Sequence, residues 1–244
     1  MHYNKAEYAI LKKQLSEVIE MEKNEVSDTF RSYIQKRKKD KVKSYKMLNR
    51  FAKKHQILFV GSSLMELFPI NEMQQSLEIG LTIYNRGVSG FVTSELLDSM
   101  DECIFELEPS KIFINIGTND LNTPDYSKEK LIHNYDMILT QINEKLPECE
   151  VYVMAYYPVN AKDDFPGTSK DFKEKRFKIR TNAAVLKANE AVKSLAEAHG
   201  YKFINVNDGL MDEEGNLKKE FSIEGIHMWP DAYKVILDNM KKYL

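Results

Sequence analysis

Cysteine is scarce in this chain: its 244 residues include only Cys103 and Cys149. Their spacing fits neither a metal site nor a disulfide framework, which favours a reduced, cytoplasmic protein. Long apolar runs are also lacking, and none approaches the roughly 20 residues that a membrane-spanning helix requires. The polar N-terminus has no apolar core of the kind found in secretory signals. We therefore expect a cytoplasmic protein without a membrane span.

Glycine and proline are absent from the first 60 residues, which favours one or two long helices there. Apolar residues recur at three- and four-residue steps through this segment. Asn24 or Ser27 is placed to cap a second helix after a break near residues 22–25. Residues 1–56 are thus predicted to form a helical extension and not an independent domain, and homodimerisation through these helices is a further expectation.

Charge is divided unevenly along the chain. Residues 1–56 carry 15 Lys and Arg against 7 Asp and Glu, whereas the remainder carries 20 against 30. A basic segment on an acidic body is compatible with binding to nucleic acid or to an anionic membrane. We favour a solvated helical face instead, because the basic residues share their helix with an apolar stripe. No nucleic-acid partner is expected.

From residue 57 onward, short β-branched and aromatic runs alternate with longer helical patterns. This alternation predicts a parallel sheet with helices on both faces. Residues 57–244 are therefore expected to form one flavodoxin-like, three-layer α/β/α sandwich with a five-stranded parallel sheet. The expected strands are Ile57–Val60, Leu81–Asn85, Lys111–Ile116, Val151–Ala155 and Lys202–Val206, and the expected helices lie around 89–107, 127–146, 170–199 and 231–243.

Ligands of such folds bind at the carboxyl edge of the sheet, so residues just after each strand are candidates for function. Ser63 follows the first strand, where its N–H would lie at a helix N-terminus and stabilise an oxyanion, although a serine there is more commonly a helix cap. Gly87 follows the second strand, where a glycine allows close approach of a ligand or simply makes a tight turn.

Asn119 follows the third strand, where its amide can donate to an oxyanion or form an Asx-turn. His227 lies near the C-terminus, three residues after Glu224, whose carboxylate is close enough to fix the imidazole tautomer. The histidine would then serve as a base toward a serine, although a single histidine is more often structural.

The order of these blocks resembles that of the SGNH or GDSL-type hydrolases. ILFVGSS is similar to the nucleophile block, YNRGVSG to the glycine block, GTND to the asparagine block and EGIHMWPDAY to the Asp-x-x-His block. The resemblance runs from about residue 57 to the C-terminus. It implies a flavodoxin-like fold and an esterase that acts on short-chain, acylated-sugar or lysolipid-type esters as small-molecule substrates, with no metal or organic cofactor.

Residue by residue, the resemblance implies that Ser63 is the nucleophile and His227 the general base, with Ser63, Gly87 and Asn119 as oxyanion donors. Two positions differ from the family pattern. Ser62 stands where the first block usually has Asp, which bears on loop geometry. Glu224 stands where the last block has Asp, and we expect it to orient His227. Asp231 is a poorer candidate because it follows the histidine.

Two other functions stay open at this point. One is an inert binding module on the same fold, and the other is an acyltransferase, which shares the first half-reaction with a hydrolase. The stretch from Tyr156 to Arg180 follows the fourth strand and either overhangs the site as a lid that selects substrates or is a surface loop leading into a helix.

Overall fold

The computed structural model describes the backbone of residues 5–77, 80–123 and 126–244, and, among the first 25 side chains, that of Glu20. It divides into two compact units, Met1–Lys41 and Val42–Leu244. The helix α1 (Lys5–Asn49) is continuous, so the predicted break near residues 22–25 is wrong. The end of α1, from Val42 to Asn49, belongs to the second unit, where Tyr45 and Asn49 are buried.

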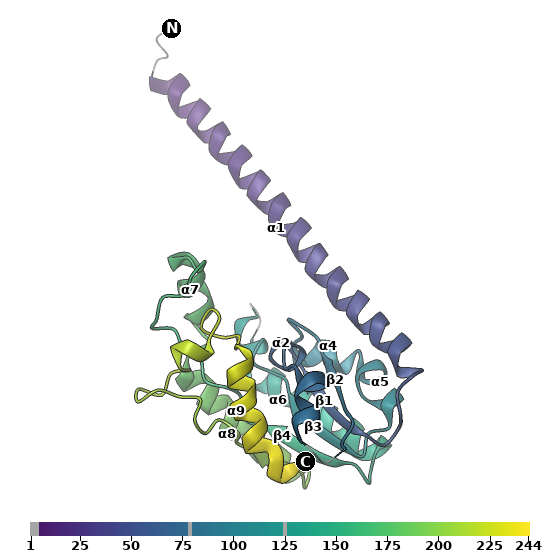
Figure 1. Cartoon of the computed structure of the whole chain (residues 1–244). Coiled ribbons are helices and arrows are strands. Elements are labelled where there is room, and N and C mark those ends of the chain that lie inside the picture. Colours follow the sequence, from purple (N-terminus) through teal and green to yellow (C-terminus); the bar gives the residue numbers. More distant parts are fainter. Residues whose placement is uncertain (1–4, 78–79, 124–125) are drawn as a thin grey trace. The chain divides into compact units, whose positions relative to one another are not determined.

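A five-stranded parallel sheet forms the centre of the second unit (Figure 1). The strand order β2-β1-β3-β4-β5 is the flavodoxin-like order and confirms the predicted fold class. In the register of the sheet, Ile57 pairs with Ile83 on one side and with Lys111 on the other. The strands are β1 (Ile57–Gly61), β2 (Ile83–Gly87), β3 (Lys111–Asn115), β4 (Glu150–Met154) and β5 (Lys202–Ile204).

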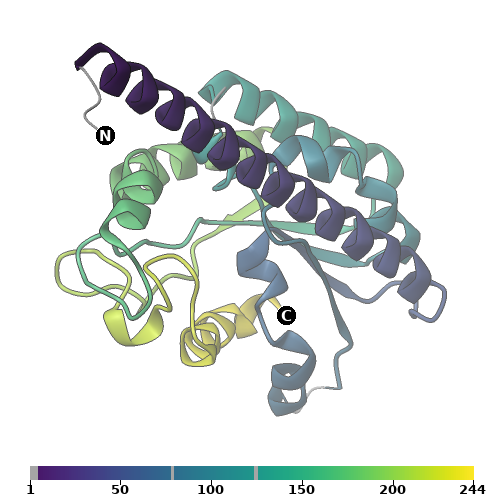
Figure 2. The ribbon, with the colours of Figure 1, turned by 90° about the horizontal axis from the view of Figure 1, so that it is seen from above.

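Helices cover both faces of this sheet and give three layers (Figure 2). Alternate strand residues point to opposite faces, so Leu58 and Val60 join one apolar core while Phe59 joins the other. The first core includes residues of α4 (Thr93–Leu97), α5 (Met100–Cys103), α6 (Lys128–Lys145) and α8 (Asn182–Ala198), and the second includes residues of α2 (Ser63–Glu66), α3 (Ile70–Met73) and α9 (Pro230–Met240).

Two of the predicted helices are interrupted. The pattern around 89–107 becomes α4, α5 and a 3-10 turn at Phe105–Leu107. The pattern around 170–199 divides into α7 (Lys170–Phe177) and α8, and Thr181 begins α8 by accepting a hydrogen bond from the Ala184 N–H. A side-chain cap of this kind satisfies a helix N–H that would otherwise lack a partner. The interruption places Arg180 in the connection between the two helices.

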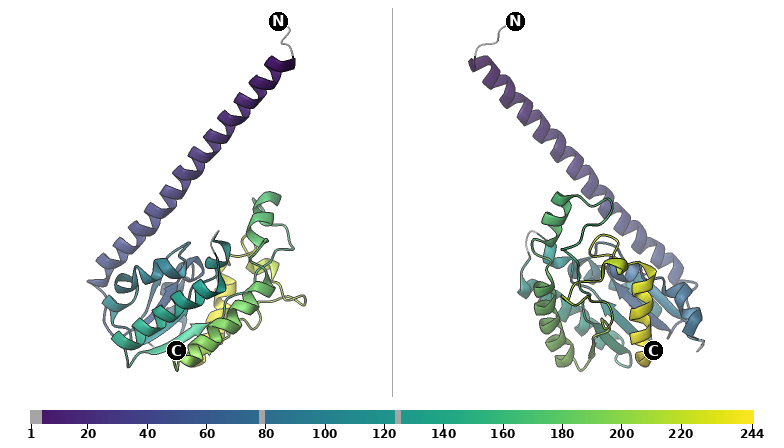
Figure 3. Two further views of the ribbon diagram at one scale, coloured as in Figure 1. Left: turned by 180° about the vertical axis from the view of Figure 1, so that it is seen from behind. Right: turned by 60° about the vertical axis from the view of Figure 1, so that its left-hand side comes forward.

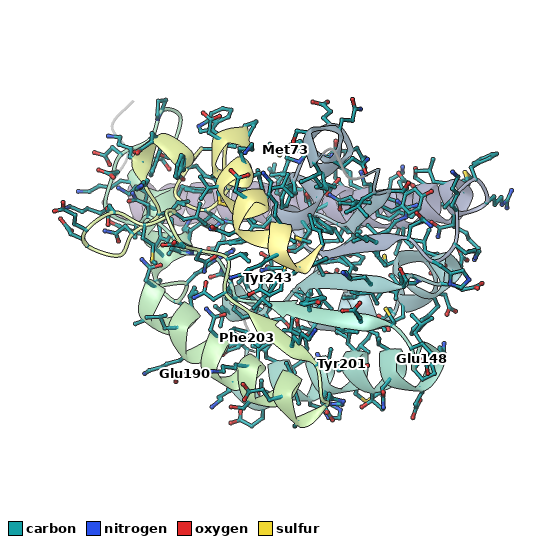
Figure 4. The ribbon with its side chains drawn as sticks, turned by 60° about the horizontal axis from the view of Figure 1, so that its bottom comes forward. Met73, Glu148, Glu190, Tyr201, Phe203 and Tyr243 are labelled. Carbon is teal, nitrogen blue, oxygen red and sulfur yellow. The ribbon has the colours of Figure 1, made fainter. Side chains whose placement is uncertain are left out.

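The carboxyl ends of the strands lie at one edge of the sheet, and α7 rises at that edge in both views of Figure 3. Figure 4 turns the opposite edge forward, where Glu148 and Tyr201 precede β4 and β5. Within the described part of the chain, no helix is long and apolar enough to cross a membrane.

Candidate active site

Ser63 is the first residue of α2, two residues beyond the end of β1. The turn depends on Gly61, because a Cβ on that residue would stand 2.1 Å from the carbonyl oxygen of Asn115. The Ser62 N–H donates to the same carbonyl at 3.3 Å, which ties the turn to β3. Ser63 is thereby held at the carboxyl edge of the sheet, with 9% of its surface exposed.

His227 and Glu224 lie in the loop that precedes α9. The Ile223 N–H donates to the His227 carbonyl at 2.8 Å, and the Gly225 carbonyl accepts from the Asn160 N–H at 2.8 Å. Gly225 has a φ of +96°, and a Cβ there would stand 2.3 Å from the Asn160 carbonyl oxygen. Only glycine fits this position without strain, so the loop that carries the histidine is closely packed against the segment after β4.

The structure brings Ser63, His227 and Glu224 into one chain of hydrogen bonds. The Ser63 Oγ lies 2.9 Å from the His227 Nε2, and the His227 Nδ1 lies 2.5 Å from the Glu224 Oε1. A carboxylate accepts hydrogen bonds and does not donate them, so this network assigns the imidazole proton to Nδ1. The Nε2 lone pair then faces the serine hydroxyl, which is the arrangement that activates a serine.

Glu224 is held in its ionised form by its neighbours. Burial alone would raise the pKa of Glu224, but the hydrogen bond from the His227 ring and the one from the His227 N–H, together with the charge of Arg176, keep that pKa below its usual value. The His227 N–H donates to Glu224 Oε1 at 3.2 Å. A carboxylate fixed in this way orients the imidazole and stabilises an imidazolium when one forms.

Asn119 lies in the turn after β3. Its Nδ2 donates to the Phe91 carbonyl at 3.0 Å, which uses one of the two amide protons. Gly117 enters the turn with a φ of +123°, and a Cβ there would stand 2.2 Å from the Tyr156 hydroxyl. Asp120, which follows Asn119, accepts from the Thr93 N–H at 3.1 Å. The turn is therefore fixed by its surroundings, and it keeps the Asn119 amide in one orientation.

Arg180 contacts the same asparagine, and no sequence motif singles it out. Its Nη1 donates to the Asn119 Oδ1 at 3.5 Å, and only 3% of the residue is exposed. Its Nε is buried and has no hydrogen-bond partner among the described residues. Burial lowers the pKa of Arg180 to about 10, which still leaves the guanidinium charged at neutral pH. The segment Tyr156–Arg180 thus ends on a buried cation beside Asn119.

Gly87 has a different role from the one expected for it. Its N–H donates to the Asn85 Oδ1 at 2.9 Å, and its carbonyl accepts from the Tyr45 hydroxyl at 2.5 Å. A Cβ on Gly87 would stand 2.2 Å from the Glu66 backbone nitrogen. Gly87 is thus a packing glycine at the contact between β2 and α2, and its N–H is already engaged. The geometry does not support the predicted role of Gly87 as an oxyanion donor.

Gly90, three residues later, has the free N–H that Gly87 lacks. It lies in the exposed turn after β2 with a φ of +80°, and no partner for its N–H occurs within residues 5–77, 80–123 and 126–244. The neighbouring Phe91 provides the carbonyl that holds the Asn119 amide. Gly90 therefore directly precedes the residue whose carbonyl accepts from Asn119. The sequence NRGVSG contains both glycines and does not distinguish their roles.

Comparison with known families finds one match that covers most of the second unit. Residues 69–235 match the model of the GDSL-like lipase/acylhydrolase family. The matched region includes Asn119 and His227 and begins six residues after Ser63. The match therefore does not include Ser63, and the contact between Ser63 and His227 is a separate observation of the structure.

Individual relatives and solved structures give similar results. The chain is 24% identical over 194 residues to platelet-activating factor acetylhydrolase IB subunit alpha2 of Gallus gallus, covering 77% of each chain. It is 22% identical over 189 residues to N-acylneuraminate cytidylyltransferase of Escherichia coli, covering 77% of this chain but only 40% of that longer relative. A Streptococcus pneumoniae structure named for platelet activating factor superimposes with a TM-score of 0.80 and 27% identity, covering 90% of this chain and 98% of that one.

Proposed function

Because the chain belongs to the GDSL-like lipase/acylhydrolase family, we propose that this hydrolase cleaves carboxylic esters of small or carbohydrate-type compounds through an acyl-enzyme on Ser63. One observation carries the proposal: the hydrogen-bonded chain from Ser63 through His227 to Glu224. An inert binding module has no need of a serine hydroxyl that faces an imidazole nitrogen whose other nitrogen is held by a carboxylate.

The reaction proceeds in two half-reactions. The His227 Nε2 takes the Ser63 hydroxyl proton as the Oγ attacks the ester carbonyl, and a tetrahedral intermediate forms. The intermediate collapses as His227 returns the proton to the leaving alcohol, and the acyl group stays on the Oγ. Water, deprotonated by His227, then attacks the acyl-enzyme, and the acid is released. Glu224 holds the imidazole tautomer and stabilises the imidazolium in both steps.

The developing oxyanion requires donors that are in place before the reaction. We assign this role to the Ser63 N–H at the start of α2, to the second proton of the Asn119 amide and to the Gly90 N–H. Support comes from the hydrogen bond that fixes the Asn119 amide on Phe91 and from the exposed turn that carries Gly90. Gly87 instead sets the close packing between β2 and α2.

The substrate class follows from the relatives only in outline. The Gallus gallus relative is named for the hydrolysis of an acetyl ester, which supports a short acyl group here. The cytidylyltransferase does not support a nucleotide substrate for this chain, because the chain spans only 40% of that relative's length. We therefore propose esters of short acids as substrates.

The proposal is tested by the hydrolysis of p-nitrophenyl acetate and p-nitrophenyl butyrate. Ser63→Ala should lower kcat by about 10⁶-fold, because the nucleophile itself is lost. The matched control is Ser62→Ala, which removes the neighbouring hydroxyl and should stay within a few-fold of the wild type. Equal rates for Ser63→Ala and the wild type would contradict the proposed function.

A further inference from the structure

The buried guanidinium of Arg180 stands out against every other charged group near the site. It is 3% exposed, and its single hydrogen bond among the described residues goes to the neutral amide of Asn119. No carboxylate of the described chain lies within ion-pair distance of it. Burial of a charge without a counter-charge is costly, and proteins normally pair such groups.

Glu224 is the acidic residue that acts on the pKa of Arg180, and it already has other partners. It attracts Arg180 electrostatically and partly offsets the effect of burial on that side chain. Its Oε1, however, accepts from both the ring and the backbone of His227. Glu224 thus carries one negative charge, whereas Arg180 and Arg176 together carry two positive charges near it, so this part of the site keeps a net positive charge.

A second cation, Arg176, lies near Arg180. Arg176, in the last turn of α7, is exposed and lies near enough to repel the Arg180 charge and to attract Glu224. An exposed cation near a buried one raises the local concentration of anions and so favours their binding. A planar guanidinium with free N–H groups is well suited to bind a carboxylate or a phosphate through two parallel hydrogen bonds.

The contact with Asn119 sets where such an anion would lie. The Arg180 Nη1 is 3.5 Å from the Asn119 Oδ1, and the same amide is proposed to donate to the oxyanion. An anionic group bound by Arg180 would therefore lie beside the Asn119 amide.

We propose that Arg180 selects ester substrates that carry a carboxylate or phosphate group beside the scissile ester, with Arg176 assisting their entry. This inference rests on the proposed esterase function and specifies its substrate class. In this proposal the segment Tyr156–Arg180 contributes to substrate specificity, because its last residue binds the negative charge of the substrate.

The test uses two matched pairs of esters that differ in one negative charge. Mono-p-nitrophenyl succinate and its methyl ester place the charge in the acyl part, and 4-acetoxybenzoate and its methyl ester place it in the alcohol part. The wild type should prefer the anionic member of one pair by about tenfold or more in kcat/KM, and the pair in question locates the anion. Arg180→Gln should abolish the preference, and Arg180→Lys should restore part of it.

The matched control is Lys178→Gln, which removes one positive charge from an exposed position two residues away and should leave the ratio within twofold. Circular dichroism of each variant reports whether it folds. If Arg180→Gln does not fold, inhibition of the wild type by monomethyl succinate, compared with the neutral dimethyl succinate, replaces it as the readout, and the anion should inhibit at least tenfold more strongly.

The outcomes separate the two proposals. Hydrolysis of neutral esters that depends on Ser63, with no preference for charge in either pair, overturns the role of Arg180 alone. So does an equal loss for both members of a pair in Arg180→Gln, because that loss indicates a merely structural role. Failure of the wild type to hydrolyse any of the four esters overturns the esterase function itself.

Discussion

The hydrogen-bonded chain of Ser63, His227 and Glu224 and the buried cation Arg180 differ in how far their neighbours satisfy them. Ser63, His227 and Glu224 satisfy one another without any ligand, through contacts of 2.9 and 2.5 Å. Arg180 is more deeply buried, yet among the described residues it has one long hydrogen bond and its Nε has no partner. The three side chains complete their hydrogen bonds without a ligand. A buried charge without a paired carboxylate is instead stabilised when an anion binds to it.

After the loss of Ser63 itself, the largest effect should come from Glu224, whose carboxylate completes the hydrogen-bonded chain. Glu224→Gln keeps the shape but removes the charge that holds the imidazole tautomer, so kcat should fall by about 10³- to 10⁴-fold. Glu224→Asp retains the carboxylate and should recover a large part of the loss. Steady-state kinetics on p-nitrophenyl acetate measure both. A Glu224→Gln enzyme within tenfold of the wild type would remove Glu224 from the site.

Asn119 accepts a hydrogen bond from Arg180 and is proposed as an oxyanion donor, and its loss should have the next largest effect. Asn119→Ala removes one oxyanion donor and should lower kcat by about 10²- to 10³-fold with a smaller change in KM. The control is Asn71→Ala, on the exposed face of α3, which should leave both constants unchanged. A change confined to KM would place Asn119 in substrate binding instead.

Gly87 tests whether packing and catalysis are separate in this part of the molecule. Gly87→Ala forces a Cβ against the Glu66 backbone and should lower the free energy of unfolding by about 1–3 kcal/mol. Gly200→Ala is the control, because nothing lies within 4 Å of its added Cβ and only backbone strain of about 1 kcal/mol remains. Urea unfolding measures both. Equal destabilisation by the two variants would argue against the packing role.

The smallest effect concerns the dependence of stability on pH. The pKa of Glu224 is lower in the folded chain than its ordinary value near 4.5, so its ionised form stabilises the fold above that pH. This contribution is lost as the pH falls below 4.5 toward the lower folded value. The difference in unfolding free energy between wild type and Glu224→Gln should therefore shrink between pH 6 and pH 4. A difference that is constant over this range would contradict the assigned ionisation.

The sequence predicted the sheet, its order and the strands to within about two residues, because buried parallel strands are nearly continuous apolar runs. It also predicted the contacts of Ser63, His227 and Glu224, whose spacing along the chain carries a recognisable pattern. It missed the interruption at residues 178–181, because the apolar pattern continues through it and the cap at Thr181 decides the break.

The two remaining differences depend on contacts that no local pattern reveals. Gly87 and Gly90 are alike in sequence, and the Asn85 side chain that engages the Gly87 N–H settles which of them is free. Arg180 stands at the end of a charged run in the sequence and is distinguished there only as the last residue of the Tyr156–Arg180 stretch. Its burial depends on how the connection between α7 and α8 packs near Asn119, which is a tertiary property.

The central claim is that Ser63 is a nucleophile activated by His227. The most direct measurement is the intact mass of the protein after exposure to a fluorophosphonate probe, which bonds to an activated serine oxygen with loss of fluoride. Wild-type protein should gain one phosphonyl group, mapped to Ser63 by peptide sequencing, while Ser63→Ala gains none and His227→Ala gains it far more slowly. A wild-type protein that stays unlabelled, or is labelled at another residue, would contradict the account.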